Sequence, residues 1–170
     1  MDLKSYIRNI PDFPKEGILF RDITTLLKDK DAYRDLVDSI VKSLEGKEVD
    51  LVIGPEARGF VIGSAVAYAI GAGFIVARKP GKLPARTNRY SYGLEYGTDV
   101  LEVHEDAIKP GQKIVIVDDL LATGGTALAT IRLAEQAGGE VVGARFAIEL
   151  TDLSGRELLR DYDVCAVMEF

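Results

Sequence analysis

Four apolar runs, rich in β-branched residues, constrain the fold of this sequence more than any other feature. They cover residues 51–53, 74–77, 114–117 and 141–148, and no polar residue interrupts the first three. A strand with one face in water would alternate polar and apolar residues, whereas these runs do not. They therefore predict buried strands of a parallel sheet that other elements cover on both faces.

Helical stretches separate the predicted strands. Residues 31–44 carry apolar side chains at helical spacing and charged side chains on the opposite face. Residues 60–70 and 127–137 predict two more helices, and Gly138 marks the end of the second. The alternation of strands and helices predicts an α/β fold, with a doubly wound, mostly parallel sheet flanked by helices.

Length and composition exclude several classes of protein. The 170 residues fit one domain spanning 1–170, and their net charge of −6 argues against nucleic-acid binding, which usually needs a basic face. The single Cys165 and the single His104 cannot supply an internal disulfide or a metal site built from cysteine and histidine. We therefore expect a globular protein whose partners are small molecules.

Residues 59–77 contain no charge and are long enough to raise the question of a membrane span. Gly71 and Gly73 interrupt this stretch, and the residues that follow have strand character. A buried helix followed by a buried strand is the better interpretation. The N-terminal residues also lack the basic and apolar regions of a signal peptide, so we expect a cytoplasmic protein without membrane contact.

The segment 114–126 joins a buried strand to a helix through a loop of small residues. Gly124 and Gly125 let the backbone approach a ligand closely. The N–H groups at the start of the following helix favour an anion, because the helix dipole is positive there. Thr123 and Thr126 add hydroxyl donors. This loop predicts a phosphate site.

An acidic pair, Asp118 and Asp119, precedes the loop. Carboxylates repel phosphate, but they accept hydrogen bonds from hydroxyl groups or hold a divalent cation. The whole segment therefore predicts a ligand with sugar hydroxyls on one side and a phosphate on the other. A plain strand–helix turn with an acidic cap is the alternative. Neither the phosphate loop of ATPases nor the glycine motif of dinucleotide enzymes occurs in the sequence.

A long segment without helical periodicity, residues 79–100, lies between the second and third strands. Long loops of this kind often act as lids, although Tyr90, Tyr92 and Val100 favour strands and leave a hairpin open. Residues 78–89 hold five cations and no acid, which favours an anion site over a solvated basic loop: Arg78, Lys79, Lys82, Arg86 and Arg89.

Five segments share their sequence and order with one enzyme family: residues 13–22, 56–60, 78–84, 91–97 and 114–126. Together they resemble the type I phosphoribosyltransferases, and the last is similar to that family's signature for phosphoribosyl pyrophosphate. Its form is that of the members that act on adenine. The resemblance implies a transferase of purine salvage that joins adenine to the ribose of phosphoribosyl pyrophosphate and releases pyrophosphate. Mg²⁺ would be carried on the substrate, with no metal site of the protein's own.

The resemblance also implies a role for each matching residue. Asp118 and Asp119 would bind the ribose hydroxyls and Glu95, in the lid, would exchange a proton with the base. A carboxyl group on a closing lid suits that role, because its pKa rises when water is excluded; a plain surface glutamate is the alternative. The residues implied to bind phosphoribosyl pyrophosphate are Ala122, Thr123, Gly124, Gly125 and Thr126 at the 5′-phosphate, and Arg58, Lys79 and Lys82 at the pyrophosphate.

Base recognition would fall to Leu19, Phe20 and Arg21 in an N-terminal hood, residues 1–30, although Phe20 as a core residue is an alternative. The family resemblance further implies a homodimer, in which the lysine-bearing loop reaches a neighbouring subunit. Two other functions stay open: transfer to another base, such as hypoxanthine or guanine, and a regulator that senses phosphoribosyl pyrophosphate without catalysis. Such regulators usually add a DNA-binding domain or a basic face, for which the length and charge leave no room.

Overall fold

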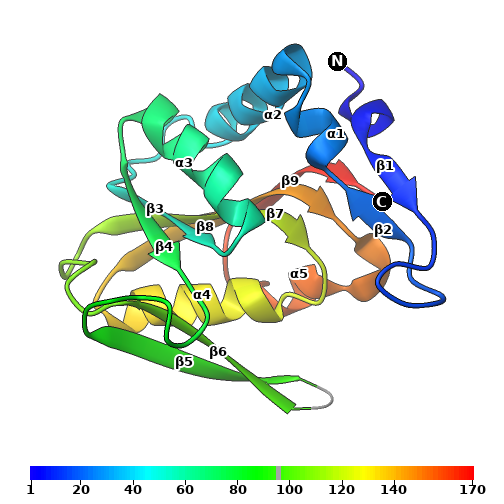
Figure 1. Cartoon of the computed structure of the whole chain (residues 1–170). Helices are drawn as coiled ribbons and strands as arrows, with labels where there is room; N and C mark the ends of the chain where they lie inside the picture. The colour runs from blue at the N-terminus through cyan, green and yellow to red at the C-terminus, as the bar shows by residue number, and fades with distance from the viewer. Residues whose placement is uncertain (95–96) are drawn as a thin grey trace.

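The computed structural model describes residues 1–94 and 97–170. Its centre is a sheet of five strands in the order β4-β3-β7-β8-β9, and each neighbouring pair is parallel (Figure 1). The sheet confirms the predicted fold class, and four of its strands are the predicted ones. The fifth, β9, lies at one edge and was not predicted. The strands are β3 (Leu51–Pro55), β4 (Gly73–Ala77), β7 (Lys113–Leu121), β8 (Glu140–Glu149) and β9 (Val164–Glu169).

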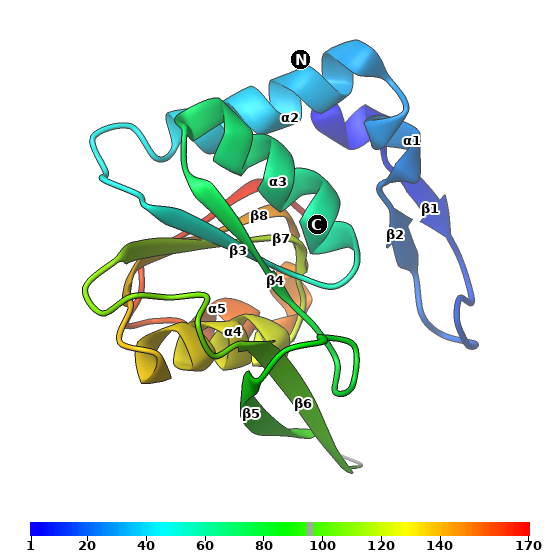
Figure 2. The same cartoon turned by 60° about the vertical axis from the view of Figure 1, so that its left-hand side comes forward.

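Helices cover both faces of this sheet, with α2 and α3 on one side and α4 and α5 on the other (Figure 2). Asp29 begins α2, because its carboxylate accepts hydrogen bonds from the N–H groups of Asp31 and Ala32. Gly71 ends α3 in the left-handed conformation that glycine adopts easily. The helices are α1 (Thr24–Leu27), α2 (Lys30–Lys42), α3 (Arg58–Ile70), α4 (Gly125–Gln136) and α5 (Gly155–Leu158), with short 3₁₀ turns η1 (Leu3–Tyr6) and η2 (Thr151–Leu153).

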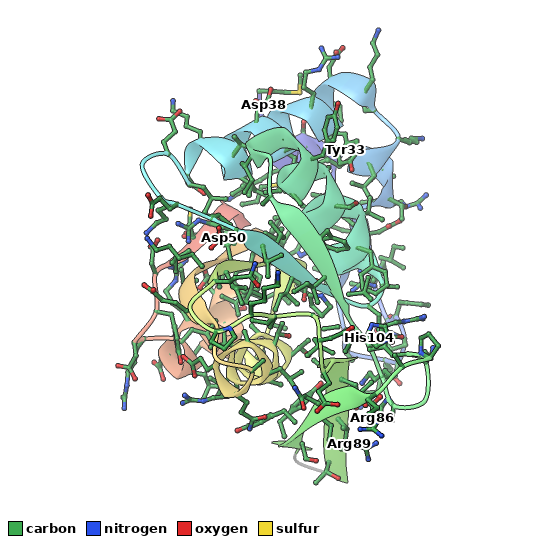
Figure 3. All side chains as sticks on the ribbon, turned by 90° about the vertical axis from the view of Figure 1, so that its left-hand side faces the viewer. Tyr33, Asp38, Asp50, Arg86, Arg89 and His104 are labelled. Carbon is green, nitrogen blue, oxygen red and sulfur yellow. The ribbon has the colours of Figure 1, made fainter. Side chains whose placement is uncertain are left out.

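The core consists of two layers, one on each face of the sheet. Val52 and Val115 point toward α2 and α3, while Ile53 and Ile116 point toward α4, and all four are fully buried. On the first face, the Tyr33 hydroxyl group of α2 also donates a hydrogen bond of 2.9 Å to a carbonyl group of α3 (Figure 3). Within the described residues, no helix combines the length and the apolar character needed to cross a membrane.

Two antiparallel hairpins flank the sheet. The N-terminal hairpin pairs β1 (Arg8–Ile10) with β2 (Phe20–Asp22). The second pairs β5 (Thr87–Leu94) with β6 (Gly97–His104) and lies against α4 (Figure 1). It occupies much of the segment predicted as a lid loop. Leu101 and Val103 of β6 are buried in the same core layer as α4, and this contact holds the hairpin against that helix.

Candidate active site

A cavity of about 290 Å³ opens where β3 and β7 end. Its position is the one expected for ligands of parallel sheets, at the carboxyl ends of the strands. Two segments line it: Glu56–Arg58, which follows β3, and Asp118–Ala127, which includes the end of β7 and the start of α4. The structure thereby brings together all the predicted residues of the acidic pair and the phosphate loop, and places with them Arg58, from a segment 60 residues earlier in the chain.

The loop between β7 and α4 is shaped by glycine. Gly124 has a φ of 89° and forms the N-cap of α4, so the loop turns in a conformation that other residues rarely adopt. Thr123 and Thr126 are exposed along the cavity wall. Backbone N–H groups and hydroxyl groups are therefore available where the dipole of α4 favours an anion.

The acidic pair forms the wall beside this loop. Asp118 and Asp119 are only 9% and 8% exposed, and the Asp119 N–H donates a hydrogen bond of 2.8 Å to Asp118 Oδ1. Burial raises the pKa of the Asp118 carboxyl group well above its usual value, and the negative charge of Asp119 raises it further. Gly59 makes room for this carboxyl group, since a Cβ atom there would lie 2.8 Å from Asp118 Oδ1.

Arg58 connects the acidic pair to the N-terminal hairpin. Its Nε atom forms an ion pair with Asp119 Oδ2, and its guanidinium group lies 5.6 Å from the centre of the Phe20 ring. The Arg58 side chain remains 48% exposed. It is thus a cation on the cavity wall that an arriving anionic ligand can reach.

Glu56 contacts three of the five basic residues within 78–89. Its carboxylate accepts a 2.6 Å hydrogen bond from the Lys79 N–H and lies 3.4 Å from both Arg78 Nε and Lys82 Nζ. Burial acts to raise the pKa of Glu56, but the Lys79 N–H and Lys82 outweigh it, so the pKa is lowered. Lys82 therefore lies beside the cavity, held by one of the residues that line it.

The last two cations of residues 78–89, Arg86 and Arg89, lie elsewhere. Arg86 directly precedes β5, and Arg89 and His104 lie on the β5–β6 hairpin (Figure 3). Arg89 forms a 2.9 Å ion pair with the buried Glu102 of β6. Neither arginine lines the cavity. Carboxylates of other segments therefore pair with most of the cations of residues 78–89, which the absence of acids within that segment did not indicate.

Lys79 joins the cavity through a chain of side chains. Its Nζ atom pairs with Asp99 of β6, and Asp99 also accepts a 3.0 Å hydrogen bond from the Tyr92 hydroxyl group. That hydroxyl group lies 3.4 Å from Thr126 Oγ1 in the phosphate loop. Lys79 lowers the pKa of the Asp99 carboxyl group, and burial raises the pKa of Tyr92. The second hairpin is thus docked on the start of α4.

The three predicted base-binding residues lie on or next to β2. Leu19 is 48% exposed, and Phe20 packs edge-on against Phe13 at a centroid distance of 5.1 Å. Arg21 donates a 2.5 Å hydrogen bond to Asn9 and lies over the Phe170 ring. The contact of Phe20 with Arg58 brings them next to the cavity. Glu95 lies outside the described residues.

Sequence reasoning missed three members of this neighbourhood: Glu56, Asp99 and Gly155. Glu56 directly follows β3, so the rule that sites form at strand ends could have found it. Asp99 and Gly155 carry no such signal. Pairing within the hairpin places Asp99, and Gly155 contacts the phosphate loop only because the chain returns there after β8.

The chain is similar to known proteins over nearly its whole length. Residues 22–167 match the sequence profile of the phosphoribosyl transferase domain. The chain is 58% identical to the adenine phosphoribosyltransferase of Alkaliphilus metalliredigens, over all of both chains, and 58% identical to that of Acidobacterium capsulatum, over 99% of this chain and 93% of the relative.

Solved structures give the same result. The adenine phosphoribosyltransferase of Thermoanaerobacter pseudethanolicus has a TM-score of 0.97 and 53% identity, covering 99% of this chain and 98% of the other. The enzyme from Saccharomyces cerevisiae, in complex with adenine and an imino-altritol bisphosphate, has a TM-score of 0.91 and 36% identity, covering 97% and 96%.

Proposed function

The chain belongs to the phosphoribosyltransferase family, among its adenine phosphoribosyltransferases, and we propose that it joins adenine to phosphoribosyl pyrophosphate to give AMP and pyrophosphate. One observation carries the proposal: a single cavity combines a buried acidic pair with a glycine-shaped helix N-terminus. A sugar phosphate offers hydroxyl groups to the first and an anion to the second.

The phosphate loop, residues Ala122–Thr126, holds the 5′-phosphate in this proposal. Asp118 and Asp119 then accept hydrogen bonds from the ribose hydroxyls. When the bond from the ribose carbon to pyrophosphate breaks, positive charge develops on the ribose. Fixed carboxylates in a site that excludes water stabilise such a transition state.

Pyrophosphate leaves with a high negative charge, and Arg58, Lys79 and Lys82 supply compensating cations. Each of them is paired with a carboxylate in the structure. Substrate binding then exchanges these partners. In particular, Arg58 turns from Asp119 to the pyrophosphate, which frees Asp119 for the ribose.

The proposed transfer is a substitution at the ribose carbon. A ring nitrogen of adenine forms the new bond, the carbon–oxygen bond to pyrophosphate breaks, and the proton of that nitrogen must leave. We assign the proton to Glu95, which lies in segment 91–97 of the predicted lid, residues 79–100. Glu95→Gln should lower kcat by about 10²-fold while changing the KM values little. An unchanged kcat would remove Glu95 from the mechanism.

Mg²⁺ is proposed to arrive with the substrate. Among residues 1–94 and 97–170, no three His, Cys, Asp or Glu side chains converge as a metal site. Mg²⁺ commonly keeps several waters and binds substrate phosphates with one or two carboxylates, a limited role that Asp118 and Asp119 fit. When bound, it neutralises charge on the pyrophosphate group.

The N-terminal hairpin is the proposed base-recognition element. Leu19, Phe20 and Arg21 supply backbone groups and an aromatic ring to adenine, and the contact between Phe20 and Arg58 brings them to the cavity. The reaction belongs in the cytoplasm, because phosphorylated substrates of this charge do not cross a membrane unaided.

A homodimer completes the proposal. On α3, the Tyr68 side chain is 90% exposed and Val61 is 43% exposed, an apolar surface that a second copy would cover. Light scattering should then give a mass near twice the 18.5 kDa of the chain. A monomer at micromolar concentration would contradict this part of the proposal.

A base panel tests the function. With Mg²⁺ and phosphoribosyl pyrophosphate, the kcat/KM for adenine should exceed that for guanine, hypoxanthine or orotate by about 10²-fold or more. Preference for another base would replace adenine as the substrate. Binding of phosphoribosyl pyrophosphate without turnover of any base would favour the regulator.

A further inference from the structure

The chain returns to the phosphate loop after β8, through η2 and α5. Figure 1 shows α5 beside the N-terminal end of α4. Gly155, the first residue of α5, is buried against the loop. A Cβ atom on Gly155 would overlap the Ala122 carbonyl oxygen and would lie 3.0 Å from Gly124 N.

The contact is reciprocal. A Cβ atom on Gly124 would lie 2.6 Å from the Gly155 carbonyl oxygen. The two backbones therefore touch directly, and glycine at both positions is what permits the approach. The phosphate loop has the returning chain on one side and the cavity on the other.

The returning chain is itself held to the sheet. Arg156 donates from Nε to Glu149 Oε1 at 3.0 Å and from a second nitrogen to the other carboxylate oxygen, and its Nη1 donates to the Val164 carbonyl group at 2.8 Å. Glu149, at the end of β8, is only 4% exposed. A two-pronged pair with a buried carboxylate fixes direction as well as distance.

A backbone bond completes the anchor. The Leu150 N–H donates a 2.9 Å hydrogen bond to the Leu121 carbonyl group, immediately before the phosphate loop. The loop and the segment that supports it thus leave the sheet from the same place. The position of Gly155 relative to Ala122 is determined by the sheet, not by the loop alone.

We propose that Gly155, held by the Arg156–Glu149 pair, is a positioning residue for the phosphate loop. It sets how far the backbone of Ala122 and Gly124 stands from the sheet, and hence where the loop presents its N–H groups. The inference rests on the proposed function, since the ligand of this loop is the 5′-phosphate. None of the three residues of this support lines the cavity.

Comparing the binding of two ligands distinguishes positioning of the phosphate loop from a general structural role of Gly155. Ribose 5-phosphate uses the phosphate loop and the acidic pair, whereas magnesium pyrophosphate uses the cations. In Gly155→Ala, calorimetric binding of ribose 5-phosphate should weaken by about tenfold or more, because displacement of a binding group by about 1 Å is costly. Binding of magnesium pyrophosphate should stay within about twofold, since its cations lie on other segments.

Arg156→Lys covers the case in which Gly155→Ala does not fold. Lysine keeps the positive charge but cannot donate to both carboxylate oxygens of Glu149 as the guanidinium group does. Binding of ribose 5-phosphate should therefore weaken by about threefold, and binding of magnesium pyrophosphate should again stay unchanged. Glu157→Ala, at the exposed neighbouring position of α5, is the matched control and should bind both ligands like the wild type.

Equal losses for both ligands, or wild-type binding of ribose 5-phosphate by folded Gly155→Ala or by Arg156→Lys, would overturn the inference. These outcomes leave the proposed function intact, since they concern only the support of the loop. A wild-type protein that binds neither ligand would overturn the proposed function and this inference with it.

Discussion

Asp118 and Asp119 are neighbours in sequence whose surroundings differ. Asp119 has a cationic partner in Arg58, while Asp118 is enclosed between β7 and the start of α3. Burial and the charge of Asp119 raise the pKa of the Asp118 carboxyl group. The pair therefore retains a proton to a higher pH than an isolated aspartate does.

Asp118→Asn should change how stability depends on pH. A carboxyl group with a raised pKa binds more protons in the folded state, so its contribution to stability is complete below its ordinary pKa of 3.8 and is lost as pH rises through the raised value. Asparagine cannot ionise but can still accept the Asp119 N–H. The melting temperature of the variant minus that of the wild type should therefore increase as pH rises from about 4 to about 8.

Thermal unfolding followed by circular dichroism at a series of pH values checks this prediction. Asp38→Asn, at an exposed position on α2, is the control and should show no such trend (Figure 3). A constant difference between Asp118→Asn and the wild type would mean that Asp118 is ionised like an ordinary aspartate.

The N-terminal hairpin depends on one carboxylate. Asp22, at the end of β2, accepts hydrogen bonds from the Thr24 N–H at 2.9 Å, the Thr24 hydroxyl group at 2.7 Å and Arg8 Nε at 3.0 Å. The Thr24 hydroxyl group and Arg8 lower the pKa of Asp22 to about 2. The hairpin and α1 are thus joined at a nearly buried charge.

Asp22→Asn should loosen this element. We expect the free energy of unfolding to fall by about 1–3 kcal/mol at pH 7, because a hydrogen-bonded charge is lost. The difference should shrink as pH falls from 3.8 toward 2, since the contribution of a carboxylate with a lowered pKa is present above its ordinary value and lost below it. Urea unfolding at both ends of this range measures the effect.

The same variant tests the base-recognition proposal, since the hairpin carries Leu19–Arg21. The KM for adenine should rise more than the KM for phosphoribosyl pyrophosphate. Asp38→Asn again serves as the control. Equal changes in the two KM values would argue that the hairpin does not recognise the base.

The elements differ in how far the sequence predicts them. The strands β3, β4 and β7 each contain an uninterrupted apolar run, and β8 contains a mainly apolar run that includes Arg145. The lack of regular polar–apolar alternation therefore identifies all four, and the loop after β7 carries its chemistry in adjacent residues. The β5–β6 hairpin was only an alternative, because β5 has few apolar residues. Packing against α4 stabilises the hairpin, and the sequence of the hairpin does not show that contact. Asp99 and Gly155 could not be predicted, since the contacts of Asp99 depend on the pairing of β5 with β6 and Gly155 meets the phosphate loop only where the chain returns after β8.

At the scale of the whole molecule, an acidic protein builds a site for an anionic substrate. The net charge is −6, yet the cations at and beside the cavity come from two loops that meet at Glu56 and the acidic pair. Their partners are carboxylates, which the pyrophosphate group would displace in the proposed reaction. In the proposed reaction, the pyrophosphate group competes for these cations more strongly than a single phosphate does, because it carries more negative charge.

Steady-state AMP formation by Asp119→Ala, beside the wild type, tests the central claim most directly. The claim is that phosphoribosyl transfer takes place in the cavity formed by the acidic pair and the phosphate loop. With adenine, phosphoribosyl pyrophosphate and Mg²⁺, we predict that the variant loses at least about 10²-fold in kcat/KM while its circular dichroism spectrum remains that of the wild type. A folded variant with wild-type turnover would contradict the account.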